Sequence, residues 1–263
     1  MPELPEIEVS RQRLDPKILG RPIHELADLD ERILSEINAD ALRQGLAGAS
    51  FTGIARFGNF LLLEVAEAAA LLISLSPSAA IEQVRPHDAM PRGTRLGLRF
   101  NDGGGLAVID PRNQSWLTYI GDESAVPELG SFGPDALNGA IDPERWWQEL
   151  QGRRAQIKGL LLEPTLIAGL GPTFADEILF QAGVRPDRKA SDLDREEAER
   201  LRQAVPATLD KAVRCQARPD QLPKAYLLRA LDQGSEACPK CGEELAKRKI
   251  QGRTTRFCPA CQT

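Results

Sequence analysis

The sequence lacks any hydrophobic run that approaches the roughly 20 residues of a membrane-spanning helix. It also lacks the pattern of a secretory signal, because its opening residues are acidic and rich in proline. We therefore expect a cytoplasmic protein with no membrane partner. The composition is otherwise ordinary, with 42% hydrophobic and 27% charged residues, so a chain of 263 residues can bury a substantial core.

Positive charge is in deficit overall but is concentrated at one end. The net charge of −5 is unfavourable for binding a polyanion. Between Lys211 and Thr263, however, eleven lysines and arginines stand against five acidic residues, a surplus of six, which leaves −11 on the first 210 residues. A basic segment on an acidic body is typical of a nucleic-acid-binding face, although a solvated basic surface has the same composition.

Cysteine is scarce, and its spacing is informative. Four of the five cysteines form two CxxC pairs, Cys238 with Cys241 and Cys258 with Cys261, which 16 residues separate. Two such turns can arrange four thiolates in a tetrahedron around Zn²⁺ with no open position. Two disulfides or a redox pair are the alternatives. Disulfides persist mainly in secreted proteins, and the sequence lacks a secretory signal, which argues against them. We predict one structural zinc ion, with Cys215 as a small buried or loop residue.

Hydrophobic patterns divide the chain into three segments. A helix is expected at 5–19, and short runs rich in branched and aromatic residues at 21–122 predict a β-sandwich. Helical periodicity follows, with two apolar stretches split by a glycine-rich turn at 169–172. We predict an α+β fold: an N-terminal helix and β-sandwich in 1–135, a helical domain with a helix–two-turns–helix motif in 136–230, and a zinc ribbon in 231–263.

The opening hexapeptide, MPELPE, has two readings. Pro5 suits the first turn of a helix, and the carboxylates of Glu3 and Glu6 suit a helix N-terminus. Alternatively, loss of Met1 would leave Pro2 with a free secondary amine beside Glu3. Such a pair could attack an electrophilic carbon and manage its protons.

In combination, these segments resemble the formamidopyrimidine-DNA glycosylase and endonuclease VIII family of base-excision repair enzymes, over essentially the whole length. The matching segments are MPELPE at the start, DPR at 110–112, FGPDAL at 132–137, IKGLLLE at 157–163, AGLG at 168–171, ADEILF at 175–180 and IQGRTTRFCPACQ at 250–262. The resemblance implies a monomeric DNA glycosylase with AP lyase activity. Its partner would be double-stranded DNA with a damaged base or an abasic site, in the cytoplasm and associated with the nucleoid.

The resemblance also assigns the catalytic residues. Pro2 would be the nucleophile: its amine attacks C1′ of the damaged nucleotide, the base is expelled, an iminium forms, and the flanking phosphates are then eliminated. Glu3 would move protons at the sugar, and Glu6 would support the site.

The family's DNA-binding positions correspond to Arg112, Lys158, Gly169, Gly171 and Arg253. The resemblance implies that Arg112 enters the gap left by the flipped base and that Arg253 clamps the flanking phosphates with its guanidinium. Lys158 falls on a position of DNA contact. The turn at 169–171 would belong to the motif that grips backbone phosphates.

Several positions depart from the family pattern. Asn59 stands where the family has a lysine used in phosphate binding and catalysis, and Pro172 replaces an asparagine that contacts phosphate. Gln114 replaces an aromatic wedge, which removes apolar insertion into the duplex. The remaining substitutions are Ser74, Ser76 and Pro77 in place of a His-x-Gly-Met stretch, Pro164 in place of glutamine and Phe174 in place of tyrosine. The segment from Val213 to Cys238 is shorter than in enzymes that cap 8-oxoguanine.

Three functional hypotheses fit this pattern. The first is a working glycosylase and AP lyase with a different lesion range, and the retained Pro2 and Glu3 favour it. The second is a damage- or structure-specific DNA-binding homologue that excises no base, which the substitutions at Asn59 and Pro172 favour. The third is a degenerate homologue whose zinc finger serves protein contacts.

Overall fold

The computed structural model describes residues 2–65, 69–120 and 130–263, with the side chains of Asp15 and Pro16 excepted. The chain divides into two compact units. The first unit contains Pro2 and residues 7–130, and the second unit contains residues 3–6 and 131–263. The finer division at 135 and 230 stays a prediction.

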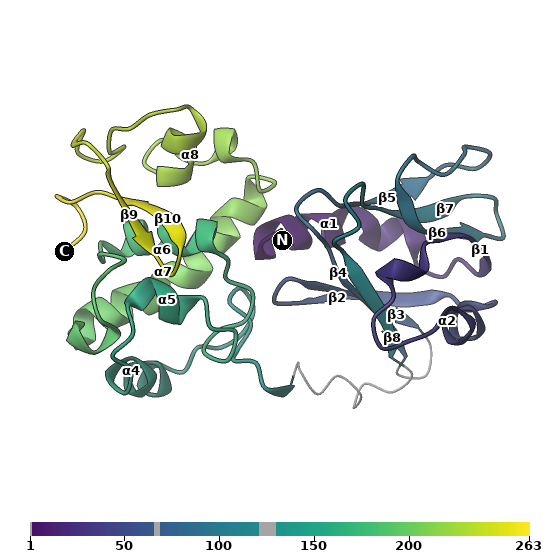
Figure 1. Ribbon diagram of the computed structural model, residues 1–263, viewed down its shortest axis with the longest axis horizontal. Helices are drawn as coiled ribbons and strands as arrows, with labels where there is room; N and C mark the ends of the chain where they lie inside the picture. Colours follow the sequence, from purple (N-terminus) through teal and green to yellow (C-terminus); the bar gives the residue numbers. More distant parts are fainter. Residues whose placement is uncertain (1, 66–68, 121–129) are drawn as a thin grey trace. The chain divides into compact units, whose positions relative to one another are not determined.

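Two antiparallel four-stranded sheets build the first unit (Figure 1), which confirms the predicted β-sandwich. One sheet has the order β1-β6-β7-β5 and the other β2-β3-β4-β8. The strands are β1 (Ile23–Leu29), β2 (Phe51–Phe57), β3 (Phe60–Val65), β4 (Ala70–Ser74), β5 (Ala80–Val84), β6 (Thr94–Phe100), β7 (Gly105–Ile109) and β8 (Trp116–Ile120).

Alternation of apolar and polar residues explains how these strands pack. In β3, every second residue is buried, as expected for a strand with one face on a core, whereas β4 is buried at all five positions. Helix α1 (Leu4–Ile18) adds Ile7, Leu14 and Ile18 to the same core, and α2 (Ala39–Leu46) adds Leu42 and Leu46. Burying each such side chain contributes about 1.5–3 kcal/mol.

Helices dominate the second unit. They are α4 (Pro143–Gln151), α5 (Ile157–Leu161), α6 (Pro172–Ala182), α7 (Arg195–Arg214) and α8 (Leu227–Asp232). Helix α7 begins with a complete capping box, in which Asp194 and Glu197 exchange side-chain-to-backbone hydrogen bonds. Trp146 of α4 is buried, and its indole N–H donates to the carbonyl of Ala198 at 2.9 Å.

The chain ends in a small β-hairpin of β9 (Ala246–Ile250) and β10 (Arg253–Phe257). Its two-residue turn, Gln251-Gly252, has positive φ at both positions (48° and 74°), the geometry that matches the twist of the flanking strands. Phe180 and Leu227 share a small buried cluster with Cys238, Leu245 and Cys258. This cluster joins the cysteine turns to α6 and α8.

Candidate functional site

The carboxylate of Glu3 is held by the N-terminus of α6. Glu3 is 8% exposed, and its two oxygens accept hydrogen bonds from the backbone N–H groups of Thr173 (2.8 Å) and Phe174 (2.9 Å). Helix α6 has no cap from its own sequence, because Gly171 occupies the N-cap position and Pro172 opens the helix. Because no neighbouring side chain caps this helix, Glu3 satisfies the free N–H groups of its first turn. The helix dipole also favours the negative charge of Glu3.

Glycine is required at the two positions singled out in the turn before α6. A Cβ at Gly171 would lie 2.2 Å from Cδ of Glu3, so no larger residue fits beside the carboxylate. Gly169 has φ of +97°, in the left-handed region that other residues rarely adopt. Both glycines thus shape the turn that receives Glu3. Their contact with phosphate stays a prediction.

Glu6 provides a second carboxyl close to the first. One of its oxygens accepts a hydrogen bond from the backbone N–H of Glu3 at 3.1 Å. Burial raises the pKa of Glu6 to about 7, and the negative charge of Glu3 acts in the same direction. A carboxyl that titrates near neutrality is suited to exchange protons at physiological pH. Pro2, which is partly buried, directly precedes Glu3 in the chain.

The DPR segment forms a loop organised around a buried aspartate. Asp110 is 0% exposed, and its carboxylate accepts hydrogen bonds from the backbone N–H groups of Arg112 (3.2 Å), Gln114 (2.7 Å) and Ser115 (2.6 Å). Burial alone would raise the pKa of Asp110, but hydrogen bonds, led by those from Ser115, outweigh it and lower that pKa to about 2. The side chain of Arg112 is exposed on this hydrogen-bonded loop.

The substituted serines near β4 support the same loop. Ser76 donates its hydroxyl to Asp110 at 3.0 Å and its backbone N–H to the hydroxyl of Ser115 at 2.9 Å. Pro77 and Gln114 are both exposed, and their correspondence to the family's wedge positions stays a prediction. Ser76 and Ser115 thus form part of the hydrogen-bonded support beneath the backbone of Arg112.

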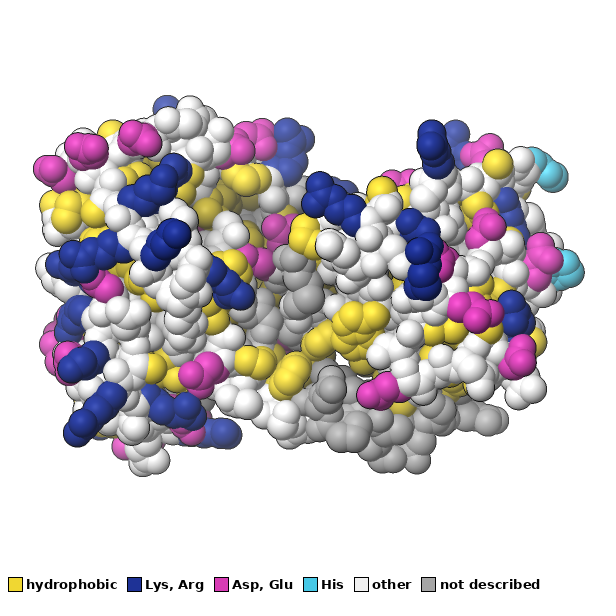
Figure 2. Space-filling view, viewed as in Figure 1, with side chains coloured by type: hydrophobic (Ala, Val, Ile, Leu, Met, Phe, Trp, Pro, Cys, Tyr) yellow, Lys and Arg dark blue, Asp and Glu magenta, His cyan; other side chains and the backbone are white. Residues whose placement is uncertain are grey.

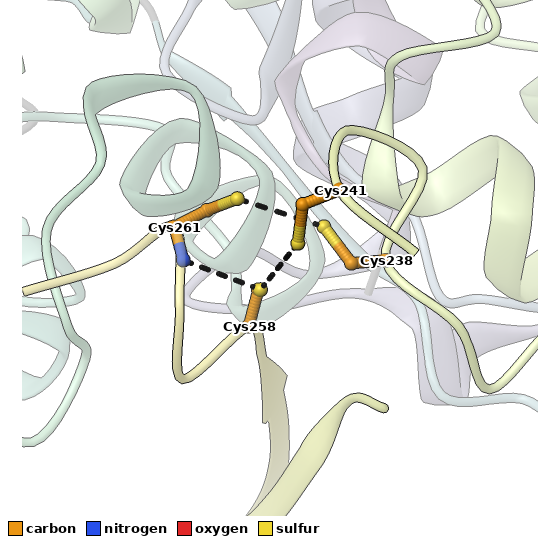
Figure 3. Close-up of side chains that lie close together, drawn as sticks. All are labelled: Cys238, Cys241, Cys258 and Cys261. Atoms are coloured by element: carbon orange, nitrogen blue, oxygen red, sulfur yellow. Dashed lines mark hydrogen bonds between the residues drawn. The ribbon is translucent and has the colours of Figure 1, made fainter. Parts of the chain in front are cut away.

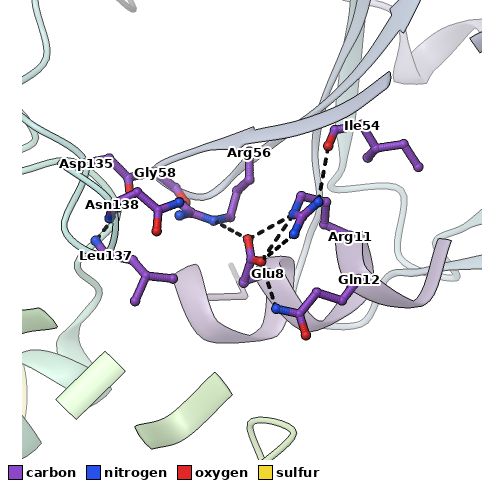
Figure 4. Close-up of polar contacts among 9 residues, drawn as sticks. All are labelled: Glu8, Arg11, Gln12, Ile54, Arg56, Gly58, Asp135, Leu137 and Asn138. Atoms are coloured by element: carbon purple, nitrogen blue, oxygen red, sulfur yellow. Dashed lines mark hydrogen bonds and ion pairs between the residues drawn. The ribbon is translucent and has the colours of Figure 1, made fainter. Parts of the chain in front are cut away.

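Asn59 lies in the β2–β3 turn, and a buried arginine holds that turn in place (Figure 4). The side chain of Arg56 is 1% exposed, with Nε 3.0 Å from Glu8 Oε2 and Nη1 2.7 Å from the carbonyl oxygen of Gly58. Burial opposes ionisation of Glu8, but hydrogen bonds from Arg11 and other neighbours lower its pKa. Because Glu8 already compensates Arg56, this arginine does not replace the positive charge that Asn59 lacks.

Lys158 occupies a buried position. Its side chain is 1% exposed, its Nζ lies 2.7 Å from Oδ1 of Asp176 on α6, and it donates to the hydroxyl of Thr255 on β10 at 2.6 Å. Burial raises the pKa of Asp176 to about 6, although Lys158 opposes the shift. Lys158 thus ties α5 to α6 and to the hairpin. A direct contact of its ammonium with DNA would require this pair to open.

Arg253 has the exposure that a phosphate ligand needs. It is the first residue of β10, directly after the hairpin turn, and its side chain is exposed. No residue in the described parts of the chain accepts a hydrogen bond from its guanidinium. Its position on the hairpin is fixed by pairing with Ile250 across the turn.

The four predicted metal ligands converge (Figure 3). The sulfur atoms of Cys238, Cys241, Cys258 and Cys261 all lie within 4.8 Å of one another, with Sγ–Sγ distances of 3.5 Å for Cys241–Cys258 and 3.9 Å for Cys238–Cys261. These distances are far longer than a disulfide bond. They match the ~3.8 Å between ligands of a tetrahedral ion with metal–sulfur bonds of ~2.3 Å. The four cysteines can therefore hold one metal ion.

Sequence reasoning missed three acidic residues that organise their surroundings, Asp110 in the first unit and Asp176 and Glu177 in the second. Asp110 and Asp176 were visible only as parts of matching segments, and nothing local distinguished them from surface acids. Glu177 is 0% exposed and accepts N–H groups of Leu227 (3.3 Å) and Leu228 (2.7 Å) at the start of α8. The one available signal was an acidic pair inside the apolar segment ADEILF, where an unpaired charge would be costly.

No helix in the described residues is both long and apolar enough to cross a membrane.

Comparisons with known proteins agree with this geometry. The model of the formamidopyrimidine-DNA glycosylase N-terminal domain matches residues 1–116, and that of the H2TH domain of the same enzymes matches residues 132–221.

Relatives and solved structures match over the full length. The chain is 32% identical to formamidopyrimidine-DNA glycosylase of Geobacter metallireducens and 31% identical to that of Halorhodospira halophila, with 100% of each chain covered. A solved structure of LlFpg with a THF-DNA and an inhibitor matches with a TM-score of 0.89, 28% identity and 100% coverage of both chains. A complex of Lactococcus lactis Fpg with abasic-site DNA matches with a TM-score of 0.87, 26% identity and 99% coverage of both. On sequence and fold alike, the chain belongs to the formamidopyrimidine-DNA glycosylase family of DNA glycosylases.

Proposed function

We propose that this chain excises damaged bases from double-stranded DNA and cleaves the strand as an AP lyase, through a Schiff base on the α-amine of Pro2. The observation that carries the proposal is the anchored carboxylate of Glu3. It is fixed by two backbone N–H groups of α6 and directly follows Pro2 in the chain. A carboxylate held without conformational freedom next to a nucleophile provides the orientation that covalent catalysis needs.

The chemistry follows from the two groups. The unprotonated amine attacks C1′ as the glycosidic bond breaks, and the base departs with the bonding electrons and a proton. Protonation of the ring oxygen opens the sugar and leaves an iminium at C1′. Loss of a C2′ proton then expels the 3′ phosphate. Glu3 is assigned the proton transfers at the sugar, and Glu6, with its pKa of about 7, is assigned the role of proton reservoir.

This mechanism requires that Met1 be removed, because only then is the Pro2 nitrogen an amine. An α-amine titrates near pH ~8, so part of the population is unprotonated at neutrality. An intact mass that includes Met1 in the active protein would exclude Pro2 as the nucleophile.

DNA binding is assigned to the exposed arginines. Arg253 would clamp phosphates, and Arg112 would fill the gap left by the displaced base. The matched Lactococcus lactis proteins were solved with abasic-site and Fapy-dG DNA, which supports a damaged duplex as the partner. The four-cysteine site is assigned one Zn²⁺ with a structural task only, because four thiolates leave no position for water or substrate.

The substitutions predict a restricted lesion range. With Pro77 and Gln114 at the wedge positions, the protein has less apolar surface to open an intact stack. Intact 8-oxoguanine should therefore be a poor substrate. Abasic sites and ring-opened purines should be better ones, because a disrupted stack costs less to open.

An incision assay on abasic, ring-opened and 8-oxoguanine duplexes tests the proposal. We expect strand cleavage in that order of preference, lost in Glu3→Gln and strongly reduced in Pro2→Gly. Glu25→Gln, at an exposed position on β1, is the matched control and should cleave as the parent does. Cleavage that survives the substitutions at Glu3 and Pro2 would refute the mechanism. Tight binding without cleavage of any duplex, with Met1 shown to be removed, would favour a damage-binding protein instead.

A further inference from the structure

The loop that carries Arg112 is also held by an arginine of β6. Arg95 is the second residue of that strand. Its guanidinium donates from Nε to the carbonyl oxygen of Asp110 at 2.7 Å and from Nη2 to that of Pro111 at 3.2 Å. These two residues directly precede Arg112 in the chain. Arg95 therefore contacts the loop through its backbone.

The peptide group between Pro111 and Arg112 is fixed at both of its polar atoms. Its carbonyl oxygen accepts from Arg95, and its N–H donates to the carboxylate of Asp110 at 3.2 Å. A peptide group is planar, and its C=O and N–H point in opposite directions, so two such contacts constrain its orientation. The direction in which the side chain of Arg112 leaves the backbone is constrained with it.

Arg95 is itself anchored by a carboxylate. Its Nη1 lies 2.7 Å from Oδ2 of Asp30, the residue after β1, and the same oxygen lies 2.6 Å from Nη2 of Arg32. Hydrogen bonds, led by those from Arg32, hold the pKa of Asp30 well below its usual range, so Asp30 is ionised at neutral pH. Three nitrogens of one planar guanidinium are thus engaged, a geometry that the ammonium of lysine cannot reproduce.

The first unit presents its cations singly or in small groups. Figure 2 shows the lysine and arginine side chains on its visible face dispersed among acidic and neutral ones. Dispersed charge steers DNA only weakly, so a single arginine there depends on its placement. The side chain of Arg112 is exposed, and ordering it on DNA costs conformational entropy. A loop that is held before DNA arrives reduces this cost.

We propose that Arg95, anchored by Asp30, is a positioning residue that holds the loop of Arg112 in the conformation in which Arg112 meets the gap left by a displaced base. The proposal rests on the DNA-binding role assigned to Arg112 above and extends it to a pair that acts through the loop backbone. Loss of Arg95 weakens binding of an abasic duplex because Arg112 must then be ordered during binding.

The test is a double-mutant cycle between Arg95 and Arg112. Affinity is measured by fluorescence anisotropy on a duplex with a stable abasic-site analogue, which is not cleaved. Arg95→Met should bind roughly threefold to tenfold more weakly than the parent, the cost of immobilising one long side chain, and Arg112→Ala should lose at least as much. In the Arg112→Ala background, Arg95→Met should change the affinity by less than about twofold, because the side chain that it positions is gone.

Two further variants separate positioning from charge. Arg99→Met is the matched control, since Arg99 lies on the same strand and donates to the backbone carbonyls of Gly103 (3.3 Å) and Asp88. It should bind within about twofold of the parent, because a charge that meets no phosphate adds little in salt. Arg95→Lys keeps the charge but cannot reach all three acceptors, so it should still bind about twofold to fivefold more weakly. Urea denaturation checks that each variant is folded.

The outcomes that would overturn the positioning role are distinct from those that test the glycosylase. Equal losses for Arg95→Met with and without Arg112, a loss of the same size in Arg99→Met, or full affinity in Arg95→Lys would each refute it. Binding to the analogue requires no cleavage. If the parent cuts no duplex yet the two substitutions are coupled as expected, the positioning role stands and the glycosylase proposal fails.

Discussion

At the scale of single residues, contacts determine the roles of the acidic groups in each unit. Glu3 caps a helix that lies 170 residues further along the chain, Glu6 loses water contact and gains a neighbouring charge, and Asp110 collects backbone N–H groups from its own loop. The surroundings of Glu6 and Asp110 shift their pKa values in opposite directions, upward for the buried Glu6 and downward for the hydrogen-bonded Asp110.

The raised pKa of Glu6 predicts a loss of stability as the pH rises. A carboxyl with a pKa of about 7 in the folded state and about 4.5 when unfolded favours folding when protonated. That contribution is fully present below pH ~4.5 and is lost as the pH rises through 7. The side chain in Glu6→Gln stays neutral at every pH. The free energy of unfolding of this variant should therefore rise by about 1–3 kcal/mol relative to that of the parent as the pH increases from 5 to 8, measured by urea denaturation. Superimposable pH profiles for the two proteins would contradict this.

Asp110 predicts the opposite dependence. Its lowered pKa means that its stabilising contribution is present above pH ~4 and is lost as the pH falls through about 2. Asp110→Asn should cost about 1–3 kcal/mol at pH 7, because several N–H and hydroxyl donors lose a charged acceptor. Asp88→Asn, at an exposed position, is the matched control and should change stability by less than about 0.5 kcal/mol. Equal effects of the two substitutions would show that the loop does not depend on this carboxylate.

At the scale of elements, local patterns predicted the fold well. Short runs rich in branched and aromatic residues predicted the sandwich strands, the glycine-rich turn marked the start of α6, and the CxxC spacing located the four-cysteine cluster. These signals are local in the sequence: the strand and turn patterns depend on neighbouring residues, and all four cysteines lie within the segment 238–261.

The contacts that assemble the site were not predictable in this way. Glu3 with α6, Lys158 with Asp176 and Thr255, and Glu177 with α8 all join residues far apart in sequence. Nothing in the neighbourhood of Lys158 separates a buried lysine from a surface one. The family resemblance placed Lys158 at a DNA contact, and only the structure located its buried partners.

The tie made by Lys158 predicts that the hairpin depends on α5 and α6. Lys158→Met leaves Asp176 buried without its partner and should destabilise the second unit by about 3–5 kcal/mol. Adding Asp176→Leu removes the orphaned charge and should recover most of the loss. Hydrogen exchange should report faster opening of β9 and β10 in the single variant. Full protection of the hairpin in Lys158→Met would contradict the assigned role.

At the scale of the whole molecule, the cysteine site is expected to determine whether the hairpin folds. Purified protein should contain one zinc ion per chain, and chelation should release it together with four reactive thiols. Without metal, hydrogen-exchange protection should be lost in β9 and β10, whereas the sandwich strands β2–β4 should keep theirs. Well under one zinc per chain in folded protein with an intact hairpin would refute a structural zinc site.

Across the molecule, exposed and buried cations of the described residues differ in their partners. The chain as a whole carries −5, yet Arg112 and Arg253 are exposed, whereas the buried cations Arg56 and Lys158 are paired with acids. This division follows from desolvation, since a buried charge must be compensated and an exposed one need not be. Because few of the family's phosphate-contacting cations are retained, we predict weak DNA binding at physiological salt, with a shallow salt slope of about −2 to −4.

The central claim is that the amine of Pro2 forms a covalent bond with the sugar of damaged DNA. Borohydride reduction on an abasic duplex tests it directly, because reduction converts an iminium into a stable amine link. The account predicts a protein–DNA adduct that maps to the N-terminal peptide beginning at Pro2, in protein lacking Met1, and a strongly reduced yield in Glu3→Gln. An adduct on a lysine side chain, or none with Met1 removed and the duplex bound, would contradict it.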